Sequence, residues 1–173
     1  MWWRSPALIA TVLAGAMALG LASCGIQPMY GGSTVGGAKL AEVMQTVDIT
    51  PIPGRVGQKV RNELIFANTG GGYAAPSKYK LDIVIRERVI NQLVRITGDA
   101  QGQVFELTAN FKIVNLANGQ TVYQGNAISR APYERFQEIF ANVRARYDAE
   151  NRAARTVSDS IKTQIAAVLS SAA

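Results

Sequence analysis

The chain of 173 residues contains no histidine and only one cysteine, Cys24. Histidine is the commonest general base and the commonest metal ligand, so its absence argues against an acid–base enzyme and against a zinc site. A single cysteine cannot form an intrachain disulfide, so the apolar core must hold the fold alone. The sequence therefore predicts a binding protein with no catalytic residues, no metal site and no cofactor beyond a group carried by Cys24.

Acidic side chains are also scarce, because 12 Asp and Glu stand against 18 Lys and Arg, a net charge of +6. The best candidates for a catalytic pair of acids are Glu134 and Glu138. The arginines around them are instead typical of a solvated charged surface. A basic surface suits anionic partners, whether nucleic acid, phospholipid head groups or phosphorylated glycolipid.

No apolar run reaches the roughly 20 residues that a membrane-spanning helix needs. The longest run, from Ala7 to Ala22, contains two glycines, follows the basic Arg4 and ends at Leu21-Ala22-Ser23 before Cys24. A basic tip, an apolar segment and a small-residue cleavage site are the parts of a secretory signal. A single spanning helix and a buried core helix are the alternatives. Export excludes nucleic acid as a partner.

The cysteine directly after Leu21, Ala22 and Ser23 makes this segment resemble a bacterial lipoprotein signal. The resemblance implies that residues 1–23 are removed and that Cys24 carries covalent lipid. Several acyl chains on one residue anchor a protein firmly, since each buried methylene contributes about 0.8 kcal/mol. Gly25, in place of an aspartate, implies sorting to the outer membrane by the same resemblance. Without Arg4 the mature chain has 17 basic and 12 acidic side chains, a net charge of +5.

Residues 24–45 are predicted to form the lipidated N-terminus and a glycine-rich tether, and residues 46–173 a single domain. Pro28-Met29-Tyr30 either belongs to the flexible tether or docks on the domain. The domain is an α+β two-layer sandwich, in which a mostly antiparallel sheet of about four strands is covered on one face by two helices.

The predicted order is strand, helix, three strands, helix. Alternating apolar and polar residues predict strands, and apolar residues three or four apart predict helices. Asn118-Gly119 predicts a tight hairpin turn, and a bulge is expected near residues 88–91. We expect Ala131-Pro132 to end the last strand and residues 136–147 to be a connection of mixed character that could be helical in part. The expected strands are 47–52, 81–94, 105–113 and 120–129, a turn is expected at 97–102, and the expected helices are 55–68 and 148–169.

Three basic residues are predicted to share the sheet face that points away from the helices. If Leu81 and Phe105 face the helices, the two-residue period turns Arg86, Arg88 and Lys112 to the other side. Arginine and lysine there could bind phosphates, or they could simply keep an ordinary sheet face solvated. Val84 and Val114 share this face, which would also suit a partner protein.

Two stretches resemble the LPS-assembly lipoprotein LptE family of the alphaproteobacterial type. They are Cys24-Gly25-Ile26-Gln27-Pro28-Met29-Tyr30-Gly31, and Tyr147 to Arg155 followed by Asp159 to Ile165. The resemblance implies an outer-membrane lipoprotein on the periplasmic side, which plugs and supports the LptD β-barrel. It implies help in delivering lipopolysaccharide to the outer leaflet, with binding but no catalysis. It also implies contact with the phosphorylated part of the lipid through basic residues such as Arg86, Arg88 and Lys112.

Two other functions fit the same sequence. An auxiliary lipoprotein of an ABC-type lipid transporter would share the signal, the size and the layering. A cell-wall enzyme would need a cleft with two or more acids of shifted pKa.

Overall fold

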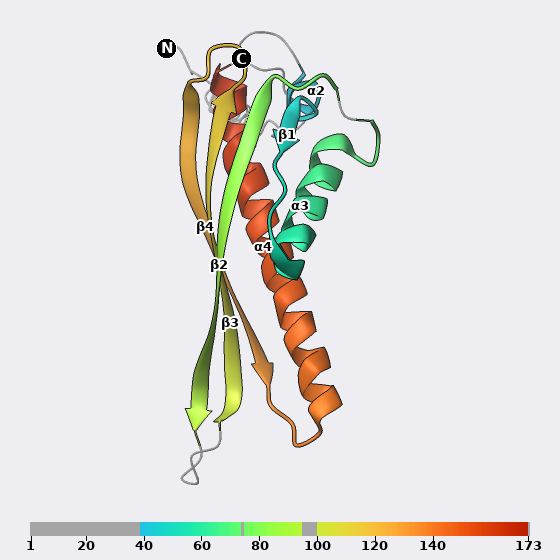
Figure 1. Cartoon of the computed structure of the whole chain (residues 1–173), viewed down its shortest axis with the longest axis vertical. Helices are drawn as coiled ribbons and strands as arrows, with labels where there is room; N and C mark the ends of the chain where they lie inside the picture. The colour runs from blue at the N-terminus through green and yellow to red at the C-terminus, as the bar shows by residue number, and fades with distance from the viewer. Residues whose placement is uncertain (1–38, 74, 95–99, 173) are drawn as a thin grey trace, which may run out of the picture.

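The computed structural model describes residues 39–73, 75–94 and 100–172, and it has the expected α+β two-layer architecture (Figure 1). A four-stranded, mostly antiparallel sheet forms one layer and helices form the other. No helix within these residues is both long and apolar enough to cross a membrane. The elements are α2 (Leu40–Met44), β1 (Val47–Ile49), α3 (Gly54–Thr69), β2 (Tyr79–Val94), β3 (Ala100–Asn115), β4 (Thr121–Glu134) and α4 (Ile139–Ala172).

The strands lie in the order β1-β2-β3-β4. The short β1 runs parallel to β2, while β2, β3 and β4 form an antiparallel meander. A hairpin connection is present where Asn118-Gly119 predicted it, and Gly119 has a φ of +68°, which glycine adopts without strain. The loop runs over residues 116–120, longer than the tight turn expected. The register shifts between Asn91 and Val94, slightly beyond the expected bulge. The turn expected at 97–102 lies partly outside the described residues.

Alternation along β3 builds the centre of the core. Phe105, Leu107, Ala109 and Ile113 are fully buried and face the helices, as period two requires. The helices meet them with apolar stripes at helical spacing. Burying one such large apolar side chain contributes about 1.5–3 kcal/mol. The helical core residues are Val56, Val60 and Leu64 of α3 and Ala154, Val157, Ile161, Ile165 and Leu169 of α4.

Strand β4 continues through Pro132 to Glu134, so the prediction that Ala131-Pro132 ends the strand is wrong. β4 is an edge strand, and proline is tolerated at an edge because its missing N–H faces no partner strand. The Pro132 carbonyl oxygen instead accepts a hydrogen bond from Arg152 Nη2 of α4 at 2.8 Å. The Asn126 carbonyl oxygen accepts one from Gln164 Nε2 at 3.0 Å. Two α4 side chains therefore cover part of this edge.

Helix α4 begins at Ile139, nine residues before the expected start, so the connection expected at residues 136–147 is helical from Ile139 onward. With 34 residues, α4 is about 50 Å long. Residues 139–147 were not assigned to this helix because Arg144 and Arg146 stand among their apolar residues. Its C-terminal half packs against α3 and the sheet, as Figure 1 shows.

Helix α2 lies within the segment predicted to be tether. Leu40 and Met44 are 1% and 2% exposed and belong to the core. The Thr46 carbonyl oxygen, just after α2, accepts hydrogen bonds from the N–H groups of Lys78 and Tyr79 at the start of β2. The packed part of the chain therefore includes α2.

Candidate functional site

The structure places Arg86, Arg88 and Lys112 on the sheet face that points away from the helices, which we call the open face. All three side chains are exposed, while Leu81, Ile83 and Phe105 on the other face are buried. Val84 also lies on the open face and is 71% exposed.

Lys112 stands apart from the two arginines. Its register partner on β2 is Asp82, and Lys112 Nζ lies 3.8 Å from Asp82 Oδ2. Lys80 Nζ lies 3.2 Å from the other oxygen of Asp82. Asp82 is four residues from Arg86, a separation of about 13 Å along a strand. Lys112 therefore belongs to a second, partly neutralised cluster.

The residue that joins Arg86 and Arg88 is Arg130 of β4. Register pairs Arg88 with Glu106 and Glu106 with Arg130, so the three side chains form one row across the sheet. Arg130 Nε lies 2.7 Å from Glu106 Oε2. Among the described residues, no hydrogen bond or ion pair engages the side chain of Arg86 or Arg88. We call Arg86, Arg88 and Arg130 the arginine cluster; it carries three positive charges around one carboxylate.

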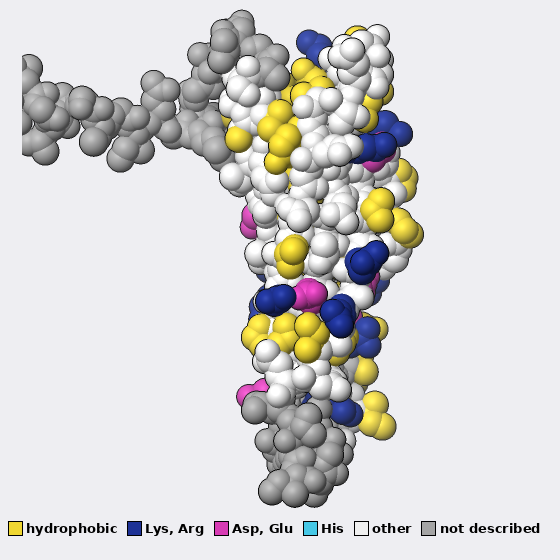
Figure 2. All heavy atoms as spheres, turned by 90° about the vertical axis from the view of Figure 1, so that its left-hand side faces the viewer, with side chains coloured by type: hydrophobic (Ala, Val, Ile, Leu, Met, Phe, Trp, Pro, Cys, Tyr) yellow, Lys and Arg dark blue, Asp and Glu magenta, His cyan; other side chains and the backbone are white. Residues whose placement is uncertain are grey.

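Figure 2 looks onto this side of the molecule and shows basic side chains on both sides of an acidic one. Apolar side chains gather directly below them in the same view. By register, Ile90, Val104 and Pro132 form the next row on the open face. Val104 is only 5% exposed although it lies on this outer face. The arginine cluster can therefore bind phosphate or carboxylate groups, arginine often with two bonds, beside an apolar surface.

Sequence reasoning missed Arg130 because it ended the strand at Ser129. A signal was present: Ala127, Ser129, Ala131 and Tyr133 keep the two-residue period beyond that point. Ala127, Ser129 and Ala131 are buried, which turns Arg130 outward.

A second candidate site lies between the helix and sheet layers. One pocket of about 420 Å³ and another of about 400 Å³ meet at Val143 and Arg146 of α4. We call the combined depression the distal groove, because it lies where α4 begins, at the end of the sheet farthest from the C-terminus of α4. Its other lining residues are Arg55, Val56, Glu87, Tyr147 and Glu150 in the first pocket, and Val89, Gln103, Tyr133, Arg135 and Asn142 in the second.

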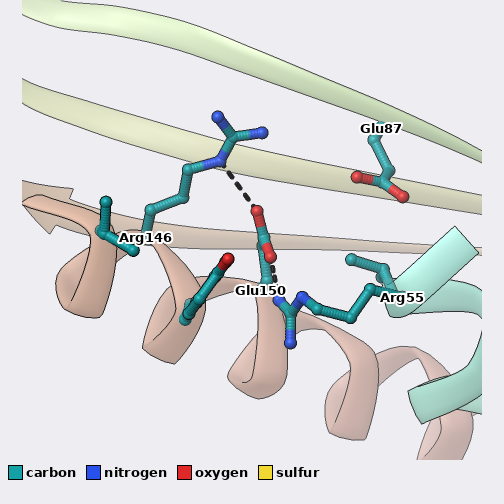
Figure 3. A pocket seen from close by; sticks show the side chains of 7 residues that line it. Arg55, Glu87, Arg146 and Glu150 are labelled. Atoms are coloured by element: carbon teal, nitrogen blue, oxygen red, sulfur yellow. Dashed lines mark hydrogen bonds and ion pairs between the residues drawn. The ribbon is translucent and has the colours of Figure 1, made fainter.

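Glu150 organises the first pocket of the distal groove (Figure 3). Its side chain is only 5% exposed and forms ion pairs with Arg55 and with Arg146 Nε, the latter at 2.8 Å. Arg55 also lies over the Tyr147 ring, 4.4 Å from its centroid. Glu87 projects from β2 toward the same space, and no interaction links it to another described residue. Sequence reasoning gave no signal for this site, because Arg55 and Glu150 are 95 residues apart.

The predicted lipid-attachment residue Cys24 and the cleavage residues Leu21, Ala22 and Ser23 lie outside the described residues. Within the described ranges, no group of three or more His, Cys, Asp or Glu side chains is placed to hold a metal ion.

The fold is one that solved bacterial lipoproteins share. A protein from Caulobacter crescentus CB15 described as a lipoprotein superposes with a TM-score of 0.64 at 19% identity, over 75% of this chain and 95% of its own. Rare lipoprotein B from Shewanella oneidensis gives a TM-score of 0.54 at 13% identity, over 70% and 92% of the two chains. Lipoprotein B from Nitrosomonas europaea gives 0.53 at 12% identity, over 70% and 81%. Neither a family model nor a curated protein matches the sequence.

Proposed function

We propose that this chain is an outer-membrane lipoprotein of the LptE kind, lipid-anchored through Cys24 on the periplasmic side. In this role it plugs and supports an LptD-type β-barrel and helps deliver lipopolysaccharide to the outer leaflet, binding the lipid without altering it. The lipoprotein-like signal and the two LptE-like stretches of sequence support the proposal. So does a fold shared with proteins described as lipoproteins.

The observation that carries the proposal is the arginine cluster. The side chains of Arg86 and Arg88 are exposed and engage no other described residue, so their hydrogen-bond donors remain available to a ligand. Phosphate and carboxylate groups are the anions whose geometry the arginine side chain matches in a bidentate manner. The apolar row of Ile90, Val104 and Pro132 beside the cluster matches a ligand that carries phosphate next to apolar groups.

The rest of the open face suits a barrel interior. The lumen of an outer-membrane barrel is polar, and most side chains on the open face are charged or polar, although Val84 and Ile128 are 71% and 55% exposed there. A plug with this surface does not have to bury a large apolar area against the barrel wall. Residues on this face away from the arginine cluster, such as Asp82, Asn110 and Gln124, would contact the wall through hydrogen bonds.

Charge reversal tests the lipid contact. Arg86 faces Thr108 across the strand pair, so Arg86→Glu breaks no ion pair among the described residues. We expect it to weaken lipopolysaccharide binding by the full-length protein about tenfold, because a charge-assisted contact becomes repulsive. Cells carrying it should become more sensitive to large antibiotics. Lys112→Glu is the matched control on the same face, and we expect a change of less than about twofold.

Purification in mild detergent tests the barrel partner. We expect a β-barrel protein to co-purify in stoichiometric amount, with the unchanged chain and with Arg86→Glu alike. Recovery of inner-membrane transport components in its place would contradict the proposal and favour an ABC-type transporter subunit. Equal lipopolysaccharide binding by the unchanged chain and Arg86→Glu would remove the arginine cluster from the mechanism.

A further inference from the structure

Several large apolar side chains are exposed close together in the first turns of α4 and the loop before them. Ile139 is 81% exposed, Phe140 71%, Phe136 48% and Val143 42%. Contiguous apolar patches of this kind on an exported protein mark a surface that binds something. This apolar surface borders the distal groove, since Val143 lines both of its pockets.

Arg146 supplies an anion-binding group at the middle of the distal groove. Glu150 holds its Nε, which leaves the two terminal nitrogens of the guanidinium without a bond to any described residue. Figure 3 shows these nitrogens pointing away from Glu150 and toward the strands. Because Glu150 fixes the side chain, the free edge of Arg146 is oriented before a ligand arrives, and preorganisation lowers the cost of binding.

The charges of the lining residues differ between the two pockets of the groove. The pocket around Glu150 holds Arg55 and Arg146 against Glu87 and Glu150, so it is close to neutral. The other pocket holds Arg135 and Arg146 with no acidic lining residue. An anionic group is therefore favoured at the second pocket, and repelled by Glu87 at the first. Apolar groups are accepted along Val89, Val143 and the rings of Tyr133 and Tyr147, which line the two pockets.

We propose that the distal groove binds an acyl chain of a phosphorylated lipid, with the anionic head group on Arg135 and Arg146. The pocket volumes of about 420 and 400 Å³ lie within the range of about 300–1,000 Å³ that is usual for ligand pockets. The inference rests on the proposed function in taking that lipid to be lipopolysaccharide. The sheet separates the groove from the arginine cluster, so the two surfaces can be tested independently.

The test is photo-crosslinking in living cells with the full-length protein. A photoreactive amino acid is placed at Val143 in the groove, at Val84 on the open face, or at Thr163, which is exposed on α4 away from both. We expect a lipopolysaccharide adduct at Val143 that exceeds the Thr163 background about tenfold, since an apolar probe in the groove lies against the bound acyl chain. Changing Arg135→Gln and Arg146→Gln together should reduce the Val143 adduct without reducing the Val84 adduct.

The outcomes separate this inference from the proposed function. A lipid adduct at Val84 but not at Val143 would overturn the groove assignment and leave the proposed function standing. A protein adduct at Val143 would overturn it as well and identify the groove as a protein interface. A Val143 adduct that survives both arginine changes would refute the assignment of the head group. Loss of adducts at both positions, with no co-purifying barrel, would refute the proposed function itself.

An apolar-to-acidic substitution provides a second measurement. Val143→Asp places a charge in the groove, and Val84→Asp places the same charge on the open face, where the side chain is even more exposed. The photoreactive residue is placed at Val89, which lines the second pocket of the groove. We expect Val143→Asp to lower the lipid adduct about tenfold, because an acyl chain that covers a carboxylate removes it from water at a cost in free energy. Val84→Asp should leave it unchanged. Equal effects of the two substitutions would overturn the inference.

Discussion

The two ends of α4 show two uses of one helix. In its C-terminal half, Val157, Ile161 and Ile165 are fully buried against the sheet, and α3 packs beside it. In its N-terminal turns, Ile139 and Phe140 are largely exposed, and charged Arg146 and Glu150 line a groove. The apolar core of the helix layer is thus concentrated in one half of α4, and the other half keeps apolar and charged groups uncovered.

Small residues mark the boundary between the two halves. Ala149, Ala153 and Ala154 are fully buried, and small side chains let neighbouring elements approach closely. Arg146 and Glu150, on either side of Ala149, line the first pocket, and Val143 and Arg146 line both pockets. The change of composition along one helix therefore separates a packed region from a region that keeps two pockets open.

The largest expected effect comes from the same substitution made at both ends of α4. Ile161→Ala removes a fully buried side chain and should lower the free energy of unfolding by about 2–5 kcal/mol. Ile139→Ala removes an 81% exposed side chain and should change it by less than about 0.5 kcal/mol. Urea denaturation of both variants measures the difference. Equal losses would show that the N-terminal turns of α4 are packed as tightly as the rest.

A smaller effect is expected from the buried carboxylate of the groove. Glu150→Gln removes the charge that holds Arg55 and Arg146, and should cost about 1–2 kcal/mol. The cost stays below that of a fully buried ion pair, because the arginine side chains are 44% and 53% exposed. Asp148→Asn is the matched control, since its pair with Arg152 is exposed and contributes less than about 1 kcal/mol. A loss no larger than the control's would mean that Glu150 does not organise the groove.

The smallest expected effect is a pH dependence in the packed half. A hydrogen bond from Lys59, with further help from Arg155, lowers the pKa of the Glu63 carboxyl below its ordinary value of 4.5. A lowered folded-state pKa adds stability above pH 4.5, and this stability is lost as pH falls through the folded-state pKa. Melting temperatures measured across that range should fall more steeply for the unchanged chain than for Glu63→Gln. Identical slopes would contradict this assignment.

The local elements followed from short-range patterns. The alternation from Phe105 to Ile113 and the Asn118-Gly119 turn depend on neighbours in sequence, and both lie where they were predicted. The groove could not be predicted, because Arg55 and Glu150 meet only through tertiary packing. Arg130 was lost to a local rule applied too strictly: proline ends a central strand but not an edge strand. The first turns of α4 carry apolar residues such as Ile139 and Val143, but these are exposed, so they do not continue the core stripe from which the rest of the helix was predicted.

Arg152 and Gln164 of α4 donate hydrogen bonds to two outer carbonyl oxygens of β4. These bonds affect how easily another chain can pair with this edge of the sheet. An uncovered edge invites another chain to add a strand. In the proposed role the protein works beside barrel strands that are still unpaired during assembly. With two of its edge carbonyl oxygens already occupied, β4 is a poorer template for another strand, and in the proposed role this would keep the protein from being incorporated into the barrel sheet.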